Sequence, residues 1–347
     1  MNQPSPVEAA LISVYDRTGV VALARALCDH GVPVYATSGT RKYLAEHGIE
    51  AHDVGELTGY PSLFDGRVKT LHPNVFGGIL KDRDDPVHRE EAAQHGIPTI
   101  STVVVNLYPF EATVAKEDAT LKEAIEQIDI GGVSLLRAAA KNYEHVTVLT
   151  DPGQYDTFVV ALANGGLDRS ARRRYATRAF ERTAEYDSAI ARYLESGLLA
   201  NELPGSLALT IPIEQPLRYG ENPQDRAAFY LAREAQLPEQ LGGKALSYNN
   251  LLDLDATLRL LVRAPLGFDP AIGPEQAAPA PYVPVRDARA AIVKHTVPCG
   301  VAERATVADA VHEALTADSV SAYGGIIAVD GTVDAAAAEQ LVGFFLE

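Results

Sequence analysis

Short β-branched runs alternate with helical patterns through the first two hundred residues of this chain of 347 residues. The run at 10–14 (ALISV) leads into a segment in which apolar residues recur at helical spacing from Val20 to Leu27. Gly31 is placed to end that helix. Because strand and helix patterns follow one another singly, the sequence predicts a parallel α/β sheet joined by crossover helices.

The same alternation continues downstream. A second run at 32–36 feeds a helical pattern at 38–48 that again closes on glycine. Continuous apolar runs at 102–108 and 145–150 are typical of strands buried on both faces. A long helical pattern at 168–196 completes the first domain, which we expect to resemble other parallel-sheet domains with helices on both faces.

A change in composition marks a domain boundary. The stretch at 201–216 shifts to proline, glycine and a short strand, so we place one domain at 1–200 and a second at 201–347. In the second domain the sequence predicts a strand at 290–295 and a helix at 306–318, with the proline-rich stretch at 264–285 as a surface insertion.

The last residues form a helical pattern that stops while still apolar. Phe344, Phe345 and Leu346 have no following element to cover them, so we expect the chain to end inside its second domain. An exposed apolar end also fits a different hypothesis, in which the second half is an interaction module that seeks a partner surface.

Charge and cysteine content exclude several classes of protein. Thirty Lys and Arg against 46 Asp and Glu give a net charge of −16, which disfavours nucleic acid and anionic membrane as partners. No run of about 18–20 apolar residues occurs. Cys28 and Cys299 form no disulfide framework, and Ala302 breaks the P-C-x-x-C pattern of zinc deaminases. We therefore expect a cytoplasmic protein without a metal.

Two strand–helix junctions carry the residues of a phosphate site. In a parallel sheet, ligands gather at the carboxyl ends of strands, where helix N-termini offer N–H groups to anions. The candidate substrate-binding residues at these junctions are Ser13, Arg17, Thr37, Ser38, Gly39 and Thr40. Helix capping alone also accounts for the Ser and Thr residues.

The segment 65–73 (DGRVKTLHP) concentrates positive charge in an acidic protein. Arg67, Lys69 and Thr70, with His72 beside them, would complete the charge around a phosphorylated ligand if this loop faces the two junctions. A solvated basic loop is the alternative.

Further polar residues follow the strand at 102–108 and precede the next helix. Asn106 and Tyr108 stand at the carboxyl end of that strand, placed to orient a ligand. Asp129 precedes a Gly-Gly pair, and Lys141 lies further along the same segment. A carboxylate and an ammonium there suit proton transfer or an oxyanion, although a helix cap and an exposed lysine fit as well.

The second half offers two candidates. Lys294 and His295 end an apolar run, where a histidine is placed to act as a general base. Arg218 and Tyr219 belong to a polar stretch, 217–225, that is flanked by apolar residues. The alternative for His295 is a purely structural role.

Taken together, seven motifs in order closely resemble the bifunctional purine biosynthesis family, which combines IMP cyclohydrolase with AICAR formyltransferase. They are GRVKTLHP, NLYPF, QIDIGG with LLRAAAKN, LRYGENP, LSYNN, KHTVPCG and SAYGGIIA. The resemblance implies a cyclohydrolase domain at 1–200 that is similar to methylglyoxal synthase. It also implies part of a formyltransferase domain at 201–347 that is similar to cytidine deaminase without its zinc.

The resemblance also implies roles for the candidates. The catalytic residues would be Lys69, Tyr108, Asp129 and Lys141 for cyclisation, and Lys294 and His295 for formyl transfer. Cyclisation of FAICAR to IMP would need no cofactor, whereas formyl transfer to AICAR would take 10-formyltetrahydrofolate as co-substrate. The substrates would be nucleotides, and the family implies a homodimer.

This sequence departs from the family pattern at several positions. Thr296 and Val297 replace the usual Ala-Asn after the Lys-His pair, and Gln224 with Asp225 replaces a His-Gln. We therefore expect formyl transfer by this chain to be impaired, the more so because the family continues past this point. The alternative function is a methylglyoxal-synthase-like domain that binds a phosphorylated effector without catalysis.

Overall fold

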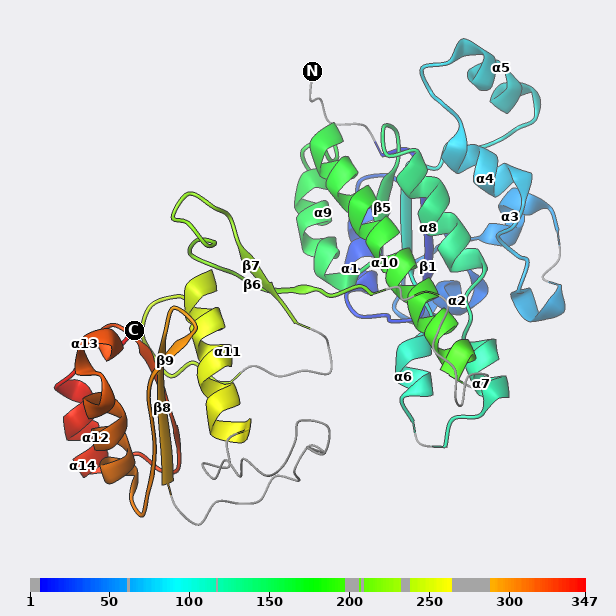
Figure 1. Ribbon diagram of the computed structural model, residues 1–347. Helices are drawn as coiled ribbons and strands as arrows, with labels where there is room; N and C mark the ends of the chain where they lie inside the picture. Colours follow the sequence, from blue (N-terminus) through cyan, green and yellow to red (C-terminus); the bar gives the residue numbers. More distant parts are fainter. Residues whose placement is uncertain are drawn as a thin grey trace. The chain divides into compact units, whose positions relative to one another are not determined.

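The computed structural model describes residues 7–60, 63–116, 118–196, 206, 209–231, 238–263 and 288–347. It divides into two compact units, Met1–Thr210 and Ile211–Glu347 (Figure 1). The domain boundary expected at 200/201 and the proline-rich stretch at 264–285 lie outside the described residues. Each unit is treated by itself below.

The N-terminal unit is built on a five-stranded parallel sheet, as the sequence predicts. The strand order is β3-β2-β1-β4-β5. Its strands are β1 (Ala10–Val14), β2 (Val34–Ala36), β3 (His52–Asp53), β4 (Thr102–Asn106) and β5 (Thr147–Leu149). The central strand β1 pairs in parallel with β2 on one side and with β4 on the other. The chain therefore adds β2 and β3 on one side of β1 and then β4 and β5 on the other, so the strand order reverses between β1 and β4.

Helices connect these strands. The four longest are α1 (Val20–Asp29), α2 (Ser38–Glu46), α8 (Gly131–Lys141) and α10 (Arg169–Ser196). The rest are α3 (Val54–Thr58), α4 (Pro73–Leu80), α5 (Pro86–Gln94), α6 (Phe110–Val114), α7 (Leu121–Glu126) and α9 (Tyr155–Leu162). Two 3-10 turns lie at Phe64–Gly66 and Pro152–Gln154. The helical patterns that begin at 20, 38 and 168 are confirmed, whereas α3 to α7 were not predicted.

Both faces of the sheet are buried. Leu11 and Val103 face a core shared with α8 and α10, while Ile12 and Val104 face a core shared with α1 and α9. Figure 1 shows these two helix pairs with the sheet between them. Since alternate side chains of one strand enter opposite cores, consecutive positions are apolar along the middle of a strand, which explains the apolar runs.

The C-terminal unit holds a three-stranded antiparallel sheet in the order β10-β8-β9, and a separate β6–β7 pair. The strands are β6 (Ile213–Pro216), β7 (Ala228–Tyr230), β8 (Ala288–Lys294), β9 (Val297–Arg304) and β10 (Ile326–Asp330). Its helices are α11 (Tyr248–Arg263), α12 (Val307–Ala317), α13 (Ser319–Ala322) and α14 (Ala335–Val342). The strand and helix expected at 290–295 and 306–318 are confirmed as β8 and α12.

The apolar end of the chain is better covered than the sequence predicts. Phe344 is half-buried, packs against the core of this unit and has its ring 6.0 Å from that of Tyr323. The Phe345 carbonyl accepts a hydrogen bond from the Gly324 N–H, although its ring stays 53% exposed. The expectation that these residues lack a covering element is therefore wrong for Phe344.

Candidate active site

The strand order reverses beside β1, which is where parallel α/β sheets commonly bind ligands. Where the order of parallel strands reverses, the connections that follow the two neighbouring strands run to opposite sides. In such sheets this leaves room for a ligand at the carboxyl ends of the strands. Here the reversal lies between β1 and β4, so the segments after Val14 and Asn106 border it. Most of the candidate residues lie on loops around this edge.

A chain of hydroxyl groups lines the ends of β1 and β2. The Thr37 hydroxyl donates to Ser13 Oγ at 3.2 Å, and the Thr40 hydroxyl accepts from the Val14 N–H at 3.1 Å. Thr37 and Thr40 are buried, so these contacts fix the turn rather than coat a surface. Because Thr37 is the N-cap of α2, these contacts also fix the start of that helix. Unpaired N–H groups at a helix start favour an anion.

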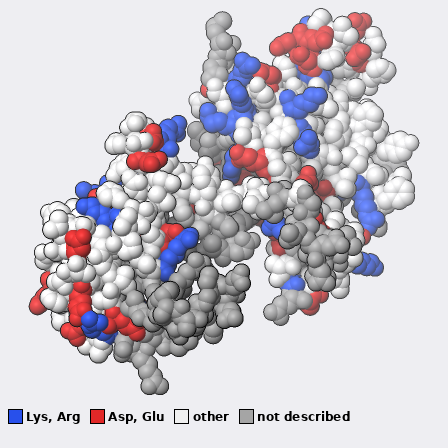
Figure 2. Space-filling model, viewed as in Figure 1, with Lys and Arg blue, Asp and Glu red and all other residues white. Residues whose placement is uncertain are grey.

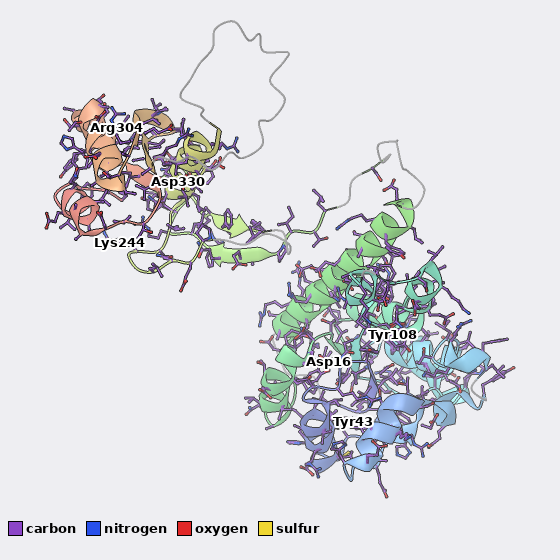
Figure 3. All side chains as sticks on the ribbon, turned by 90° about the horizontal axis from the view of Figure 1, so that it is seen from below. Asp16, Tyr43, Tyr108, Lys244, Arg304 and Asp330 are labelled. Carbon is purple, nitrogen blue, oxygen red and sulfur yellow. The ribbon has the colours of Figure 1, made fainter. Side chains whose placement is uncertain are left out.

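Asn106 ties the ends of β1 and β4 together. Its Oδ1 accepts from the N–H groups of Tyr15 and Asp16 at 2.6 and 2.9 Å, and its Nδ2 donates to the Asp16 carbonyl at 2.8 Å. The Tyr15 and Tyr108 rings meet edge to face, 5.8 Å apart. Figure 3 labels Asp16, Tyr43 and Tyr108 in this part of the N-terminal unit. Asn106 therefore organises the site instead of presenting a free amide to it.

Lys69, Asp129 and Tyr108 form an electrostatically coupled group. Burial lowers the pKa of the Lys69 ammonium, and the charges of Asp53 and Asp129 partly oppose that shift. Burial raises the pKa of Asp129, which is opposed by hydrogen bonds from the N–H groups of Gly132 and Tyr108 and by Lys69. Burial and Asp129 raise the pKa of the Tyr108 phenol. The pKa values of Lys69 and Asp129 thereby shift toward neutral pH, as proton transfer requires, whereas that of Tyr108 shifts away from it.

The Gly131–Gly132 pair allows the close packing at Asp129. A Cβ at Gly132 would lie 2.3 Å from Asp129 Oδ2, and one at Gly131 would lie 2.9 Å from Thr70 Oγ1. The Thr70 side chain is buried, so it has little room to move away. Only glycine at both positions lets the start of α8 approach the carboxylate and the hydroxyl together.

The remaining residues of the basic segment lie apart from this group. The Arg67 guanidinium pairs with Glu126 at 2.7 Å on an exposed surface. His72 caps α4, its Nδ1 accepting from the Asn74 N–H at 3.1 Å. Thus Lys69 and Thr70 carry the predicted function of this loop, while Arg67 and His72 have structural partners.

Three other predicted residues surround the first turn of α2. Ser38 and Gly39 are its exposed first residues, directly after the Thr37 cap. The Arg17 guanidinium stacks on the Tyr43 ring, 4.7 Å from its centre. This stacking keeps a cation beside the turn without pairing it to a carboxylate.

Lys141 does not join the group within one chain. It is the exposed last residue of α8, while Asp129 precedes the first. Ten residues of helix separate Gly131 from Lys141, a rise of about 15 Å. Within one chain, α8 therefore separates Lys141 from Asp129 along its length, and a role for Lys141 in the reaction stays a prediction.

In the C-terminal unit, Lys294 and His295 lie at a tight hairpin turn between β8 and β9. Lys294 pairs with Val297 across the ladder, and His295 and Thr296 form the turn with φ of 53° and 61°. The Asp253 carboxylate accepts from both turn N–H groups, at 3.1 Å and 2.7 Å. The Lys294 ammonium donates to the Tyr323 carbonyl at 2.6 Å. The pair is therefore held at the tip of a hairpin.

A second polar cluster joins the motifs around 218 and 250. Arg218 donates to Asn250 Oδ1 at 3.0 Å and stacks over the Tyr219 ring, 5.3 Å from its centre. Asn250 Oδ1 also accepts from the Ser247 N–H and hydroxyl, while the Asn250 N–H donates to the Ser247 hydroxyl at 3.2 Å. The Asn250 amide nitrogen donates to Glu347 at 2.8 Å. Arg218 and Tyr219 are thus neighbours, as their adjacency in the chain implies.

Sequence reasoning missed three positioning residues. Asp53 acts on Lys69, Asp253 holds the hairpin turn, and the Tyr186 hydroxyl bridges the Gln127 carbonyl and the Asp129 N–H. Asp53 and Glu56 have the spacing of a capping box, so the sequence could have identified Asp53 as a helix cap. Nothing local marks the other two, because their partners are more than 40 residues away.

We also searched the described residues for a metal site, a membrane-spanning helix and a charged face. Among the described residues, the one His/Asp group close enough to hold a cation is Asp82, Asp84 and His145, and His145 Nε2 is already paired with Asp82 at 3.1 Å. No helix in the described segments is long and apolar enough to span a membrane. On the face drawn in Figure 2, basic and acidic side chains are interspersed among the described residues.

Comparison with known proteins places the chain in a family. The family model for the AICARFT/IMPCHase bienzyme matches residues 139–347, and that for the MGS-like domain matches residues 19–134. The chain belongs to the AICARFT/IMPCHase bienzyme family. The resemblance seen in the ordered motifs is thereby confirmed, as is the expectation of an MGS-like domain followed by an AICARFT/IMPCHase domain.

Relatives in this family match nearly the whole chain. The bifunctional purine biosynthesis protein PurH of Prochlorococcus marinus (strain MIT 9303) is 48% identical over 97% of this chain and 63% of its own length. PurH of Rhodopirellula baltica is 44% identical over the whole chain and 64% of its own length. A crystal structure of ForH is 37% identical, with a TM-score of 0.49 over 54% of this chain and 98% of that one. The chain spans less than two thirds of the length of these two PurH relatives.

Proposed function

We propose that the N-terminal unit closes FAICAR to IMP. The observation that carries this proposal is the convergence of Lys69, Tyr108 and Asp129 at the carboxyl edge of the sheet. The family supplies the substrate, since its members are AICARFT/IMPCHase bienzymes. The hydroxyl chain at β1 and β2 and the first turn of α2 supply the place for the phosphate.

The ring closure needs positioning, charge stabilisation and proton movement. The carboxamide nitrogen of FAICAR attacks the formyl carbon and a C–N bond forms. The formyl oxygen then leaves as water with one proton from that nitrogen and one from the formamido nitrogen, which closes the C=N bond of the ring. Lys69 stabilises the oxygen on which negative charge develops, and Asp129 accepts a hydrogen bond from the attacking amide. Tyr108 relays a proton at the same centre. Holding both ends of the ligand supplies the near-attack geometry.

In the C-terminal unit we propose one part of a formyl-transfer site. Arg218 and Tyr219 would contact the AICAR phosphate or base, and Lys294 and His295 would assist attack of its amine on the formyl carbon. The formyl donor would be 10-formyltetrahydrofolate. We further propose, on the family pattern, a cytoplasmic homodimer, which sedimentation of this chain against a chain ending near residue 200 would test.

The decisive experiment follows the absorbance change as FAICAR closes to IMP. Lys69→Ala should lower kcat/KM by at least about 100-fold, the usual effect of losing a transition-state charge partner. Lys122→Ala is the matched control, because Lys122 is an exposed lysine on α7. Tight IMP binding without turnover by the wild-type chain would instead support a domain that only binds a phosphorylated effector.

A further inference from the structure

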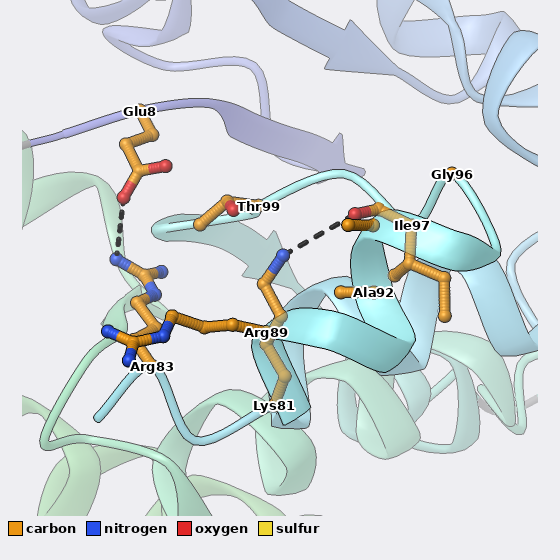
Figure 4. Close-up of a pocket in the computed structure, with 9 residues that line it drawn as sticks. Glu8, Lys81, Arg83, Arg89, Ala92, Gly96, Ile97 and Thr99 are labelled. Atoms are coloured by element: carbon orange, nitrogen blue, oxygen red, sulfur yellow. Dashed lines mark hydrogen bonds and ion pairs between the residues drawn. The ribbon is translucent and has the colours of Figure 1, made fainter. Parts of the chain in front are cut away.

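A cavity of about 510 Å³ opens at the edge of the sheet opposite the candidate active site (Figure 4). It is bordered by the segments that lead into β1 and β4, by the loop between α4 and α5, and by α5 itself. Its size lies within the range of small-molecule sites. The residues that matter for its chemistry are Glu8, Lys81, Arg83, Arg89, Ala92 and Ile97.

The cavity is strongly cationic in an acidic protein. Three of its lining residues, Lys81, Arg83 and Arg89, are basic, and Glu8 alone is acidic, which leaves two positive charges uncompensated. Along the loop after α4, Lys81 and Arg83 are half-buried, while Asp82 between them is exposed. The loop thus places its two cations toward the protein, although burying a charge away from water costs free energy.

These three cations carry more N–H groups than there are hydrogen-bond acceptors around them among the described residues. Lys81 donates to the Pro98 carbonyl at 3.1 Å and to the Ile97 carbonyl at 3.4 Å. Arg83 donates to the Ile100 carbonyl at 3.2 Å and pairs with Glu8 at 3.4 Å. The Arg83 Nε is buried and meets no acceptor in the described part of the chain. Among the described residues no acceptor meets the Arg89 guanidinium, and Figure 4 shows that side chain extending toward Arg83.

Burial of the two loop cations is costly without an anion. Burial lowers the pKa of Lys81, and the neighbouring Arg83 adds to the shift. Burial lowers the pKa of Arg83 as well. A dianionic group would offset both effects by matching the excess charge and accepting from the free donors.

We propose that this cavity binds a small phosphate monoester. The phosphate is held by Arg83, Arg89 and Lys81, because forked guanidinium groups match its oxygens and the ammonium adds a point charge. The apolar side chains of Ala92 and Ile97 pack against the remainder of the ligand. The site is separate from the candidate active site, so the proposal stands whatever reaction the latter performs.

The test is titration of the full chain with ribose 5-phosphate, observed at the methyl resonances of Ala92 and Ile97. These methyl groups report on the cavity alone, which separates it from a phosphate bound near α2. Saturable shifts at both resonances are expected. Their absence up to 10 mM ligand overturns the proposal, and tighter binding of citrate than of ribose 5-phosphate overturns the assignment to phosphate.

Charge variants sharpen the test. Arg89→Glu should weaken binding at least tenfold, and the exposed position of Arg89 leaves the fold intact. Glu8→Gln should tighten binding about threefold, since it removes the one opposing carboxylate. Lys122→Glu makes the same change in net charge on exposed α7 and should have no effect. Equal weakening by Lys122→Glu and Arg89→Glu would show that total charge, not the cavity, attracts the ligand.

Discussion

The two units hold their reactive groups in opposite ways. In the N-terminal unit, Lys69, Tyr108 and Asp129 come from three separate segments spread over 60 residues of chain and meet because a five-stranded sheet brings their loops to one edge. In the C-terminal unit, Lys294 and His295 are consecutive and occupy a hairpin turn clamped by Asp253. The first arrangement depends on contacts between distant segments, and in the second one carboxylate, that of Asp253, accepts from both N–H groups of the turn.

This difference predicts where each unit is vulnerable. A change that disturbs backbone packing should damage the N-terminal group even when no reactive residue is altered. A change at the clamp should loosen the hairpin while the N-terminal unit continues to work. The predictions below test this contrast, from the largest expected effect to the smallest.

Gly132→Ala should produce the largest effect. The new Cβ would lie 2.3 Å from the Asp129 carboxylate, so that carboxylate or the start of α8 must move. We expect FAICAR closure to slow by about 10- to 100-fold and the free energy of unfolding to fall by about 1–3 kcal/mol. Activity and thermal unfolding measure the two effects.

Gly242→Ala is the matched control for that variant. A Cβ at Gly242 meets nothing within 4 Å, so neither activity nor stability should change. Full activity of Gly132→Ala would show that the packing at Asp129 is not needed for the reaction.

Asp253→Ala should destabilise the C-terminal unit by about 1–3 kcal/mol, because two turn N–H groups lose their acceptor. Both belong to residues with positive φ, which an L side chain rarely adopts unsupported. Asp255→Ala, on the same helix, removes only an exposed pair with Arg259 and should cost under about 1 kcal/mol. Urea unfolding compares the two, and FAICAR closure should survive in both.

Alkaline pH should weaken the N-terminal unit through buried tyrosines. Burial raises the pKa of Tyr186 to about 12, and that of Tyr155 to about 12. The unfolded chain releases these protons near pH 10, so between pH 10 and 12 the folded chain binds more protons. The free energy of unfolding therefore falls as pH rises through this window, by about 2 kcal/mol for each tyrosine.

Tyr186→Phe should flatten that dependence by about half, since Tyr155 remains. Tyr248→Phe is the control, because Tyr248 is 39% exposed and lies in the other unit. Unfolding by urea at pH 9 and pH 11 measures the slope. An unchanged slope in Tyr186→Phe would contradict the assignment.

Glu126→Gln should have the smallest effect. Its carboxylate pairs with Arg67 where both side chains are more than half exposed, so stability should change by under about 1 kcal/mol. If Arg67 turns to a nucleotide phosphate, releasing it should tighten IMP binding about twofold to threefold. Calorimetry measures this, and weaker binding would argue that Glu126 positions Arg67.

Much of the N-terminal fold could be predicted from local pattern. The spacing of Val20, Leu23, Ala24 and Leu27 identified the buried face of α1, because an amphipathic helix repeats every 3.6 residues. The short helices between 54 and 126 could not be predicted in this way. Segments of five to eight residues show too few turns for a period, and the nine-residue α5 keeps only Ala92 buried.

The candidate site was predicted in part for a similar reason. Motifs identified Lys69, Thr70, Tyr108 and Asp129, and the sheet edge brings them together. Arg67 and His72 belong to the same motif, yet they pair with Glu126 and cap α4. A motif records which residues occur together and not the direction in which each side chain turns.

The sequence by itself determined the parallel sheet, the faces of its long helices and the family. These follow from periodicity and ordered motifs, which are local properties. Only the tertiary structure decided that Asp253 clamps the hairpin, that Tyr186 supports Asp129, that α8 carries Lys141 away, and that three cations share a cavity. Such outcomes depend on contacts between residues far apart in the chain, and no local pattern encodes which distant partner a side chain will meet.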